Sequence, residues 1–391
     1  MKPFIQPGFQ RTIFLSMIQL CSFMFFCGCI VKYDATGIEE LADILVVEGI
    51  ITDDETLITL SRSVNLSETD MGSVFVENAR VYVDCDDGTK WLGEYSNYEH
   101  RYLIKTDKLN LEKKYRLRIE MEEPDHHSAD CIEGKKESCP LKTYEYRSEY
   151  AYPVKTPEID SIFWVKTARK QPVQIYVSTH SPESKILYYY WSYQEVWEIQ
   201  ADFWLQGYPV YCWGKSNSAD LLIGSAEKTV FGQLTDKVVE IAPTNNKLSI
   251  LYRIDIKQHA ISKKTYNYFK NIKKNSLQTS GLFAPVPSEL RGNIICTNDT
   301  ERPVIGYVDI SSSTHQQLYI PSMVWEPDNS NWDCDLVRKD SLLKWNNGII
   351  PRDYVLAIAN PQPPDYYVRI RCVDCTLKGG STQEPDDWPE R

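Results

Sequence analysis

The sequence predicts a mainly β protein, in which an N-terminal prealbumin-like or immunoglobulin-like β-sandwich precedes a larger β-rich domain with one or two helices. Short apolar or alternating segments begin at Ile44, and turn-forming residues separate them at intervals of about 8–12 residues, as in antiparallel sandwiches. The 25 Tyr, 12 Phe and 10 Trp residues favour strands and an ordered core. A helical spacing of apolar residues stands out at 262–275.

Residues 1–28 have the composition of an export signal. Lys2 and Arg11 form a basic start, and the apolar run Ile13–Phe26 is too short to span the roughly 30 Å of a bilayer core. Gly28 then precedes Cys29, an order that resembles the bacterial lipobox, in which the signal is removed and the cysteine is acylated. Cleavage elsewhere and a single anchor helix are the alternatives. The sequence therefore predicts a lipid on Cys29 and a tether at 29–43.

The residue after the predicted lipid site indicates where the protein resides. An acidic residue there usually retains a lipoprotein at the inner membrane, whereas this chain has Ile30. We therefore expect a lipid-anchored outer-membrane protein, on either the periplasmic face or the cell surface. Loss of Lys2 and Arg11 with the signal changes the formal net charge from −11 to −13, so nucleic acid is not an expected partner.

Residues 44–123 are expected to form the first sandwich. The run Ile44–Ile51 is a short apolar strand, and further strands are expected at 56–64, 79–85, 90–95, 102–104 and 114–120. Asp87-Gly88 predicts a tight hairpin, because glycine tolerates the positive φ of a primed turn. A calcium loop is the alternative for Asp84, Asp86 and Asp87, but the other ligands of an EF-hand are missing from the sequence.

The stretch 124–158 interrupts the strand pattern and is expected to be an exposed loop that leads into the second domain. A disulfide between Cys131 and Cys139 is predicted to close this loop. His126 and His127 are expected to be solvated, because adjacent side chains point apart and a metal would need ligands from elsewhere.

Residues 159–391 are expected to form the larger second domain. Its clearest strand is Leu248–Ile256, in which every second residue is apolar. Ser262 is a plausible N-cap for the helix at 262–275, because hydroxyl side chains accept hydrogen bonds from the first free N–H groups of a helix. We expect this helix to pack on a sheet as a structural element.

Eight cysteines remain once Cys21, Cys27 and Cys29 are set aside. An even number in an exported chain favours disulfides. At least one bridge is expected to fix the C-terminal Cys372-x-x-Cys375 tail to the second domain, whereas zinc is a less favoured alternative because no second C-x-x-C accompanies it. No metal or cofactor is expected. The disulfide candidates are Cys131, Cys139, Cys212, Cys296, Cys334, Cys372 and Cys375.

An aromatic cluster supplies the candidate ligand-binding residues. Trp191, Tyr193 and Trp197 would share one face of a strand at 187–200, and Trp204 and Trp213 follow closely. If this face points outward, it is the type of aromatic surface that captures sugars or peptides. If it points inward, the same side chains form sandwich core, and the sequence leaves both interpretations open.

The sequence contains no catalytic signature. It has no phosphate loop, G-x-S-x-G elbow, H-E-x-x-H helix or dinucleotide fingerprint. Asp and Glu are so abundant that composition cannot identify a glycosidase-like pair of carboxylates. We therefore expect a non-enzymatic protein, with a cryptic hydrolase as the less favoured alternative.

Three ordered stretches resemble one protein family. They are Tyr211-Cys212-Trp213, the segment from Leu248 to Val304-Ile305-Gly306-Tyr307 with Gly292-Asn293-Ile294 inside it, and the tail from Cys372-x-x-Cys375 to Gly379-Gly380. Together with the lipobox and the opening Leu45-Val46-Val47-Glu48-Gly49, they resemble the Bacteroidota lipoproteins grouped as domain-of-unknown-function family 4249. The chain departs from that pattern in an insertion at 131–139 and in a long loop at 329–347.

The resemblance implies an outer-membrane lipoprotein that is often encoded beside a TonB-dependent transporter, and it brings no catalytic residues. The expected function is therefore a non-enzymatic accessory and binding partner of such a transporter in nutrient uptake. A structural or adhesive cell-surface lipoprotein is the alternative.

Overall fold

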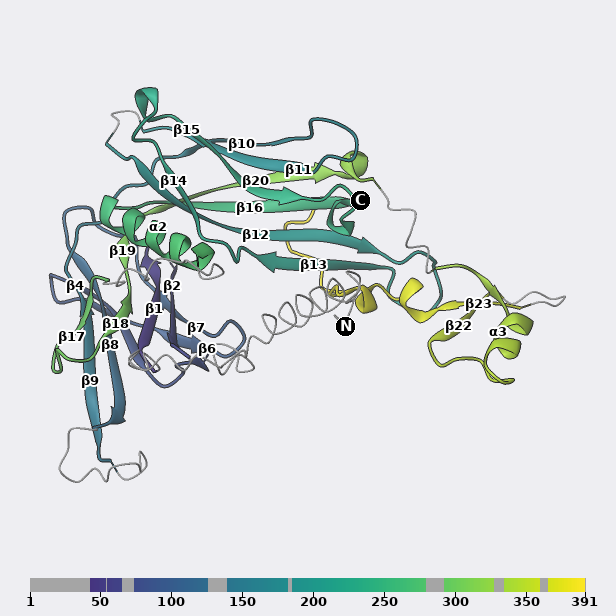
Figure 1. Cartoon of the computed structure of the whole chain (residues 1–391), viewed down its shortest axis with the longest axis horizontal. Helices are drawn as coiled ribbons and strands as arrows, with labels where there is room; N and C mark the ends of the chain where they lie inside the picture. Colours follow the sequence, from purple (N-terminus) through teal and green to yellow (C-terminus); the bar gives the residue numbers. More distant parts are fainter. Residues whose placement is uncertain are drawn as a thin grey trace, which may run out of the picture. The chain divides into compact units, whose positions relative to one another are not determined.

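The computed structural model describes residues 43–53, 55–64, 74–125, 139–181, 185–278, 292–326, 334–358 and 365–390 (Figure 1). These residues belong to one unit, Asp43–Arg391. Strands predominate, and the mainly β class predicted from the sequence is confirmed. The predicted signal, the tether, Cys29, Cys131 and the His126-His127 pair lie outside the described residues.

The first sandwich consists of two sheets that share one core. One sheet has the order β18-β1-β2-β7-β6, with β3 beside β2 and β19 beside β1, and the other has the order β17-β9-β8-β4-β5. Inward-facing residues of both sheets, such as Val47, Ile58, Val83 and Leu117, are almost completely buried. The strands are β1 (Leu45–Ile51), β2 (Glu55–Arg62), β3 (Val74–Phe75), β4 (Arg80–Cys85), β5 (Lys90–Leu92), β6 (Glu94–Ser96), β7 (Arg101–Lys105), β8 (Tyr115–Pro124), β9 (Leu141–Ser148), β17 (Ile294–Cys296), β18 (Val304–Gly306) and β19 (Asp309–Ile310).

The hairpin predicted at Asp87-Gly88 joins β4 to β5. Gly88 has a φ of +93°, and its N–H donates to the Cys85 carbonyl at 3.1 Å. The Asp87 carboxylate accepts from the Thr89 N–H at 2.8 Å and from Lys113 Nζ at 2.6 Å. These two bonds account for Asp87 as a turn residue.

Two parts of the first sandwich differ from the predicted boundaries. The stretch 124–158, predicted to be a loop, contains β9, whose buried Tyr144 and Tyr146 alternate with outward-facing residues and pair with β8. The segment 294–310, predicted to belong to the second domain, supplies β17 to β9 and supplies β18 and β19 to β1. The first sandwich is therefore built from two segments that are far apart in the sequence.

The second sandwich also has two sheets around one core. The orders are β10-β11-β15 and β13-β12-β16-β20, with β14 beside β12. Tyr252, Ile254 and Ile256 are fully buried on one face of β16, as their predicted alternation requires. The strands are β10 (Ile159–Val165), β11 (Val173–Thr179), β12 (Tyr188–Gln200), β13 (Tyr211–Asn217), β14 (Leu222–Ser225), β15 (Leu234–Ile241), β16 (Leu251–Ala260) and β20 (Ser313–Pro321), and the short 3-10 helices are η3 (Val230–Gly232), η4 (Asn246–Leu248) and η5 (Ser322–Val324).

The predicted helix is α2 (Lys263–Gln278). Ser262 Oγ accepts from the Thr265 N–H at 3.2 Å, which agrees with its predicted role as the N-cap. The buried carboxylate of Asp309 in β19 accepts from the Ser262 N–H at 2.7 Å and from the Thr265 hydroxyl at 2.6 Å. These bonds fix the start of α2 to β19 of the first sandwich.

A third, smaller sheet has the order β21-β23-β22. It is formed by β21 (Val337–Arg338), β22 (Tyr354–Ile358) and β23 (Tyr366–Arg369), and it is accompanied by α3 (Lys339–Trp345), η6 (Ile370–Cys372) and η7 (Cys375–Lys378). Within the described ranges, no helix combines the length and apolar character needed to cross a membrane.

Candidate functional site

The candidate site is the C-terminal module, which we define as residues 201–210 together with residues 334–378. Val368, Cys372 and Val373 form its buried centre, and Phe203, Leu205 and Tyr208 from the connection between β12 and β13 pack against them. The Phe203 N–H donates to the Cys372 carbonyl at 3.0 Å, and the Cys375 N–H donates to the Pro209 carbonyl at 3.1 Å. The module is therefore joined to the end of the second sandwich by packing and by backbone hydrogen bonds.

Two disulfides fix the C-terminal module. Cys212 of β13 is bonded to Cys375, and Cys334 is bonded to Cys372, with Cα–Cα distances of 5.7 and 5.6 Å. The predicted attachment of the tail to the second domain thus agrees with the structure, and each cysteine of the C-x-x-C pair has a different partner. Cys139 is also disulfide-bonded, while its predicted partner Cys131 lies outside the described residues.

Cys296, a disulfide candidate, is instead a buried free thiol, as is Cys85. Burial raises the pKa of both thiols. The two residues lie on β4 and β17, which β8 and β9 separate in the sheet. Three strand spacings of about 4.8 Å place them roughly 14 Å apart, beyond the roughly 7 Å Cα separation that a disulfide can bridge.

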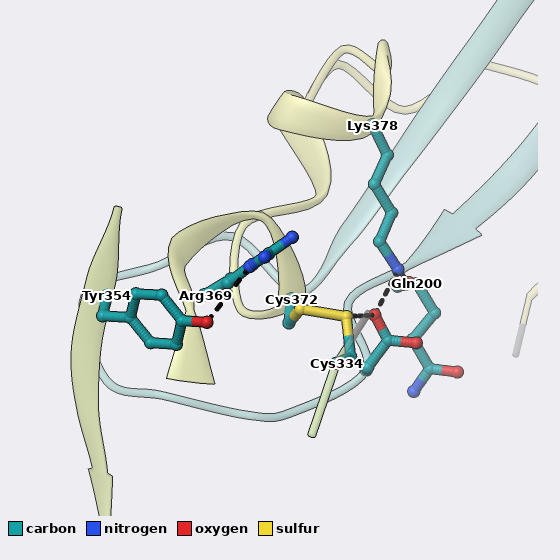
Figure 2. Close-up of a disulfide and its surroundings, with 7 residues drawn as sticks. Gln200, Cys334, Tyr354, Arg369, Cys372 and Lys378 are labelled. Carbon is teal, nitrogen blue, oxygen red and sulfur yellow. Dashed lines mark hydrogen bonds and ion pairs between the residues drawn. A yellow bond between two sulfur atoms is a disulfide. The ribbon is translucent and has the colours of Figure 1, made fainter. Parts of the chain in front are cut away.

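Polar contacts surround the Cys334–Cys372 bond (Figure 2). Lys378 Nζ donates to the Gln200 carbonyl at 3.0 Å and pairs with the Asp202 carboxylate at 2.6 Å, and Figure 2 shows its side chain reaching toward the disulfide. Asp202 Oδ2 lies 3.2 Å from Cys334 Sγ. A disulfide sulfur has no proton to donate, so this approach is a close contact next to the ion pair rather than a hydrogen bond.

Asp202, Cys334 and Cys372 have the spacing of a metal site. Ligand atoms of Asp202, Cys334 and Cys372 lie within 4.8 Å of one another. A cysteine binds zinc as a thiolate, and here both sulfurs are consumed by the disulfide. The group is therefore a structural crosslink beside an ion pair.

The end of the chain lies against the outer face of the β12–β16 sheet. Trp388 is buried beside Val196 and Trp213, and Ser381 forms a bridge to Trp213. Arg253 of β16 pairs with Asp387 at 2.6 Å. The hydrogen bond from Arg253 lowers the pKa of Asp387, so this carboxylate is ionised at neutral pH. The tail beyond the disulfides is thus held by packing and by charge.

Several large apolar side chains of the C-terminal module are exposed. Trp204 is 75% exposed and Trp345, at the end of α3, is 73% exposed. Ile349 after α3 and Leu377 in η7 are also exposed. An apolar surface on a crosslinked scaffold is suited to binding another molecule, because its side chains lose less conformational freedom on binding than those of a flexible segment.

Most of the predicted aromatic ligand-binding residues face inward. Trp191 is 2% exposed and donates from Nε1 to Gln258 Oε1 at 2.8 Å, and Tyr193 and Trp197 pack against the second core. Trp213 is also buried, under the C-terminal tail. The outward-facing interpretation is therefore wrong for this strand face, because the β10-β11-β15 sheet covers it. Of the five predicted residues, Trp204 alone is exposed.

Trp345, Ile349 and Leu377 were not identified from the sequence. The segment before Asn347 was noted only as a departure from the family pattern. The apolar run Leu342-Leu343-x-Trp345 in this segment could have indicated an exposed apolar side chain, because a helix of 7 residues has too narrow a buried face to cover all three. Leu342 is fully buried, whereas Trp345, the last residue of α3, is exposed.

Comparison with known proteins gives one family match. A family model described as "Domain of unknown function (DUF4249)" matches residues 32–132 and 140–317, which is more than half of the chain. Residues 133–139 between the two matched segments fall within the insertion noted in the sequence, and residues 334–378 lie after the match. No curated protein matches the chain. A two-domain fibronectin type-III segment of chicken tenascin is similar at 11% identity, over 56% of this chain and 90% of that chain, with a TM-score of 0.16.

Proposed function

Because the chain belongs to the domain-of-unknown-function family 4249, we propose that it is a lipid-anchored outer-membrane protein that acts as a non-enzymatic accessory of a TonB-dependent transporter in nutrient uptake. Membership of the family agrees with the resemblance seen in the sequence motifs. The lipobox-like order at Gly28-Cys29 supports a membrane tether, and the lipid would hold the β-rich body beside a barrel in the same membrane.

The observation that carries the proposal is the set of exposed apolar side chains on the C-terminal module. Trp204 and Trp345 are each about three-quarters exposed, and tryptophan is over-represented among the residues that dominate protein–protein binding energy. A buried aromatic side chain can contribute roughly 150–250 Å² of contact area, which is a large part of the approximately 800 Å² that a standard interface buries on each partner. We assign these side chains to contact with the transporter.

The lipid anchor is tested by metabolic labelling with radioactive palmitate. The wild-type protein is expected to take up label, and Cys29→Ala is expected to lose it because the acyl acceptor is gone. Label that persists in Cys29→Ala would contradict acylation at this residue. Protease treatment of whole cells then distinguishes display on the surface from the periplasmic face.

The transporter partnership is tested by affinity purification of the protein from detergent-solubilised outer membranes. We expect an outer-membrane transporter to co-purify with the wild type, and its yield to fall at least tenfold with the combined Trp204→Ser and Trp345→Ser substitutions. Tyr98→Ser is the matched control, because Tyr98 is 93% exposed but lies in the first sandwich.

Three results would contradict the transporter proposal. The chain could be recovered without a transporter and bind host matrix or other cells, as an adhesive protein does. It could turn over peptides or glycans in a way that one carboxylate substitution abolishes, as a hydrolase does. The third is a gene neighbourhood that encodes no outer-membrane transporter.

A further inference from the structure

A polar cleft opens on the outer face of the β17-β9-β8-β4-β5 sheet. Its volume is about 350 Å³, and its lining comes from β4, β5, β8, β9 and the residues next to them. Small-molecule sites in proteins begin at about this size, roughly 300 Å³. The cleft lies in the first sandwich, away from the residues that define the C-terminal module.

The most deeply buried carboxylate of the cleft is already paired. Asp84 is 3% exposed, and Arg118 contacts it through a fork, with Nε–Oδ2 at 2.8 Å and Nη2–Oδ1 at 3.1 Å. Arg116 donates to the same carboxylate at 3.3 and 3.4 Å. Arg118 also lies 3.9 Å from the centre of the Tyr82 ring and pairs with Glu120. Asp84 and Arg118 therefore lie at the bottom of the cleft and already have hydrogen-bond partners there.

Glu145, a second acidic residue of the lining, also has its hydrogen-bond donors already. Glu145 accepts from Arg147 at 2.5 Å and from the Thr297 hydroxyl at 2.9 Å. Burial raises the pKa of Glu145, but the hydrogen bonds from Arg147 and Thr297 outweigh this effect and lower it overall. Glu145 is therefore ionised at neutral pH and already has its donors.

Unused hydrogen-bonding capacity in the cleft belongs instead to cationic donors. Arg147 Nε is buried and has no hydrogen-bond partner among the described residues. Arg116 uses Nε and Nη2 on Asp84, and its guanidinium lies 4.3 Å from the centre of the Tyr150 ring, which fixes its direction. Lys90 is exposed at the rim and makes no ion pair within the described ranges. These groups offer N–H donors to an incoming anion.

The strand register adds an independent observation. Arg118 of β8 lies directly opposite Arg147 of β9, and the next outward pair places Glu120 opposite Glu145. Like charges directly opposite one another destabilise a sheet. Asp84 and Glu120 offset the charge of Arg118, and Glu145 offsets that of Arg147, so the donor left over on this pair is Arg147 Nε.

We propose that this cleft binds the carboxylate group of a small organic ligand through Arg116, Arg147 and Lys90. A carboxylate matches the planar donors of arginine and carries one negative charge. A phosphate dianion fits less well, because the carboxylates of the lining already balance its cations; these carboxylates are Asp84, Asp86, Glu120 and Glu145. Binding in the cleft is a property of the first sandwich and does not depend on the transporter partnership.

The test uses two peptides that differ only in the group of interest, trialanine and trialanine amide. Isothermal titration of the purified whole protein in low salt is expected to give saturable binding of trialanine and at least tenfold weaker binding of the amide. Arg147→Gln and Arg116→Gln are each expected to weaken trialanine binding at least tenfold. Lys90→Gln is expected to weaken it several-fold without disturbing any ion pair of the described residues. Lys105→Gln is the control, because Lys105 is an exposed cation on β7 of the other sheet and does not line the cleft.

Each of the following results would overturn the assignment. The first is an absence of saturable trialanine binding. The second is equal affinity for the acid and the amide. The third is an unchanged affinity for trialanine in both Arg147→Gln and Lys90→Gln. Inorganic phosphate that displaces trialanine at equal concentration would also overturn the choice of a carboxylate.

Discussion

Gly306 lies at the point where β18 runs beside β1. Its φ is +154°, and a Cβ placed on it would lie 2.4 Å from the Val47 carbonyl oxygen and 3.0 Å from the Val47 Cβ. The first contact is with backbone that is paired in the sheet, so it has little freedom to move. The requirement for glycine here therefore combines backbone conformation with a close approach of two strands.

We expect Gly306→Ala to lower the free energy of unfolding by about 2–3 kcal/mol, because the strained conformation costs about 1–3 kcal/mol and the clash adds to it. Urea unfolding followed by circular dichroism measures the change. Gly207→Ala is the control, because Gly207 also has a positive φ of +91° but has open space around its Cβ position. An equal loss in both variants would contradict a role for the contact with Val47.

His259 is a buried histidine in β16 that is held neutral. It is 5% exposed, lies beside the Tyr190 ring and contacts Ser311 Oγ at 3.4 Å. Burial, with a smaller effect from Lys257, lowers the pKa of His259 to about 3. Because the unfolded chain binds this proton near pH 6.5 and the folded chain does not, stability falls as the pH drops from about 6.5 toward 3.

The free energy of unfolding of the wild type is expected to fall between pH 6 and pH 4 by up to about 1.4 kcal/mol per pH unit on account of His259. His259→Gln is expected to show a slope that is smaller by this amount, because the substituted side chain binds no proton. His315→Gln is the control, since it removes an exposed histidine from the neighbouring strand. Parallel slopes for the wild type and His259→Gln would refute the assignment.

Among the structural elements, the two crosslinks of the C-terminal module differ in the length of chain that they close. Cys212 and Cys375 are 163 residues apart, and Cys334 and Cys372 are 38 residues apart. Closing a longer loop removes more conformational entropy from the unfolded chain. From the loop lengths, the Cys212–Cys375 bond is expected to contribute about 1 kcal/mol more than the Cys334–Cys372 bond.

This order is tested with two double variants, Cys212→Ser with Cys375→Ser, and Cys334→Ser with Cys372→Ser. Each is expected to lose about 2–5 kcal/mol in guanidinium unfolding, with the larger loss in the first. Cys85→Ala is the control for a cysteine without a crosslink, and its response to reductant is expected to match that of the wild type. A larger loss in the second variant would show that native-state packing dominates over loop length.

Local patterns in the sequence were sufficient to predict elements whose stabilising contacts are near in the chain. The turn at Gly88, the N-cap at Ser262 and the buried face of β16 all follow from the spacing of a few residues. Trp191 shows the limit of such patterns. Its alternation identified a shared strand face, but only the position of the β10-β11-β15 sheet determines that this face is interior.

Long-range pairing was not predictable from the sequence in the same way. Val304–Gly306 forms a parallel pair with β1, whose residues lie more than 250 positions earlier, and its short apolar run would fit either sandwich. The candidate site also depends on contacts between distant parts of the chain. Trp204 and Trp345 come from separate segments, which the disulfides and the β21-β23-β22 sheet bring into one module. Topology, rather than local propensity, sets these contacts.

For the whole molecule, this pairing predicts that the first sandwich requires the distant segment. A chain truncated after Gln278 lacks β17, β18 and β19, and it leaves one edge of β1 and of β9 unpaired. We expect that fragment to lose the cooperative unfolding transition of the first sandwich and to aggregate through the open edges. Size-exclusion chromatography and thermal unfolding, compared with a chain that ends after Pro321, provide the measurement. A monomeric fragment with a cooperative transition would contradict the prediction.

The parallel contact of β1 with β18 and β19 also has a consequence for biogenesis. A chain is synthesised from its N-terminus, so β1 emerges from the ribosome long before the strands that complete its sheet. The first sandwich therefore cannot close until residue 310 has been synthesised. During that interval β1 and β9 expose unpaired backbone groups, which chaperones would need to protect from aggregation. The first part of this sandwich to be synthesised is thus among the last to complete its pairing.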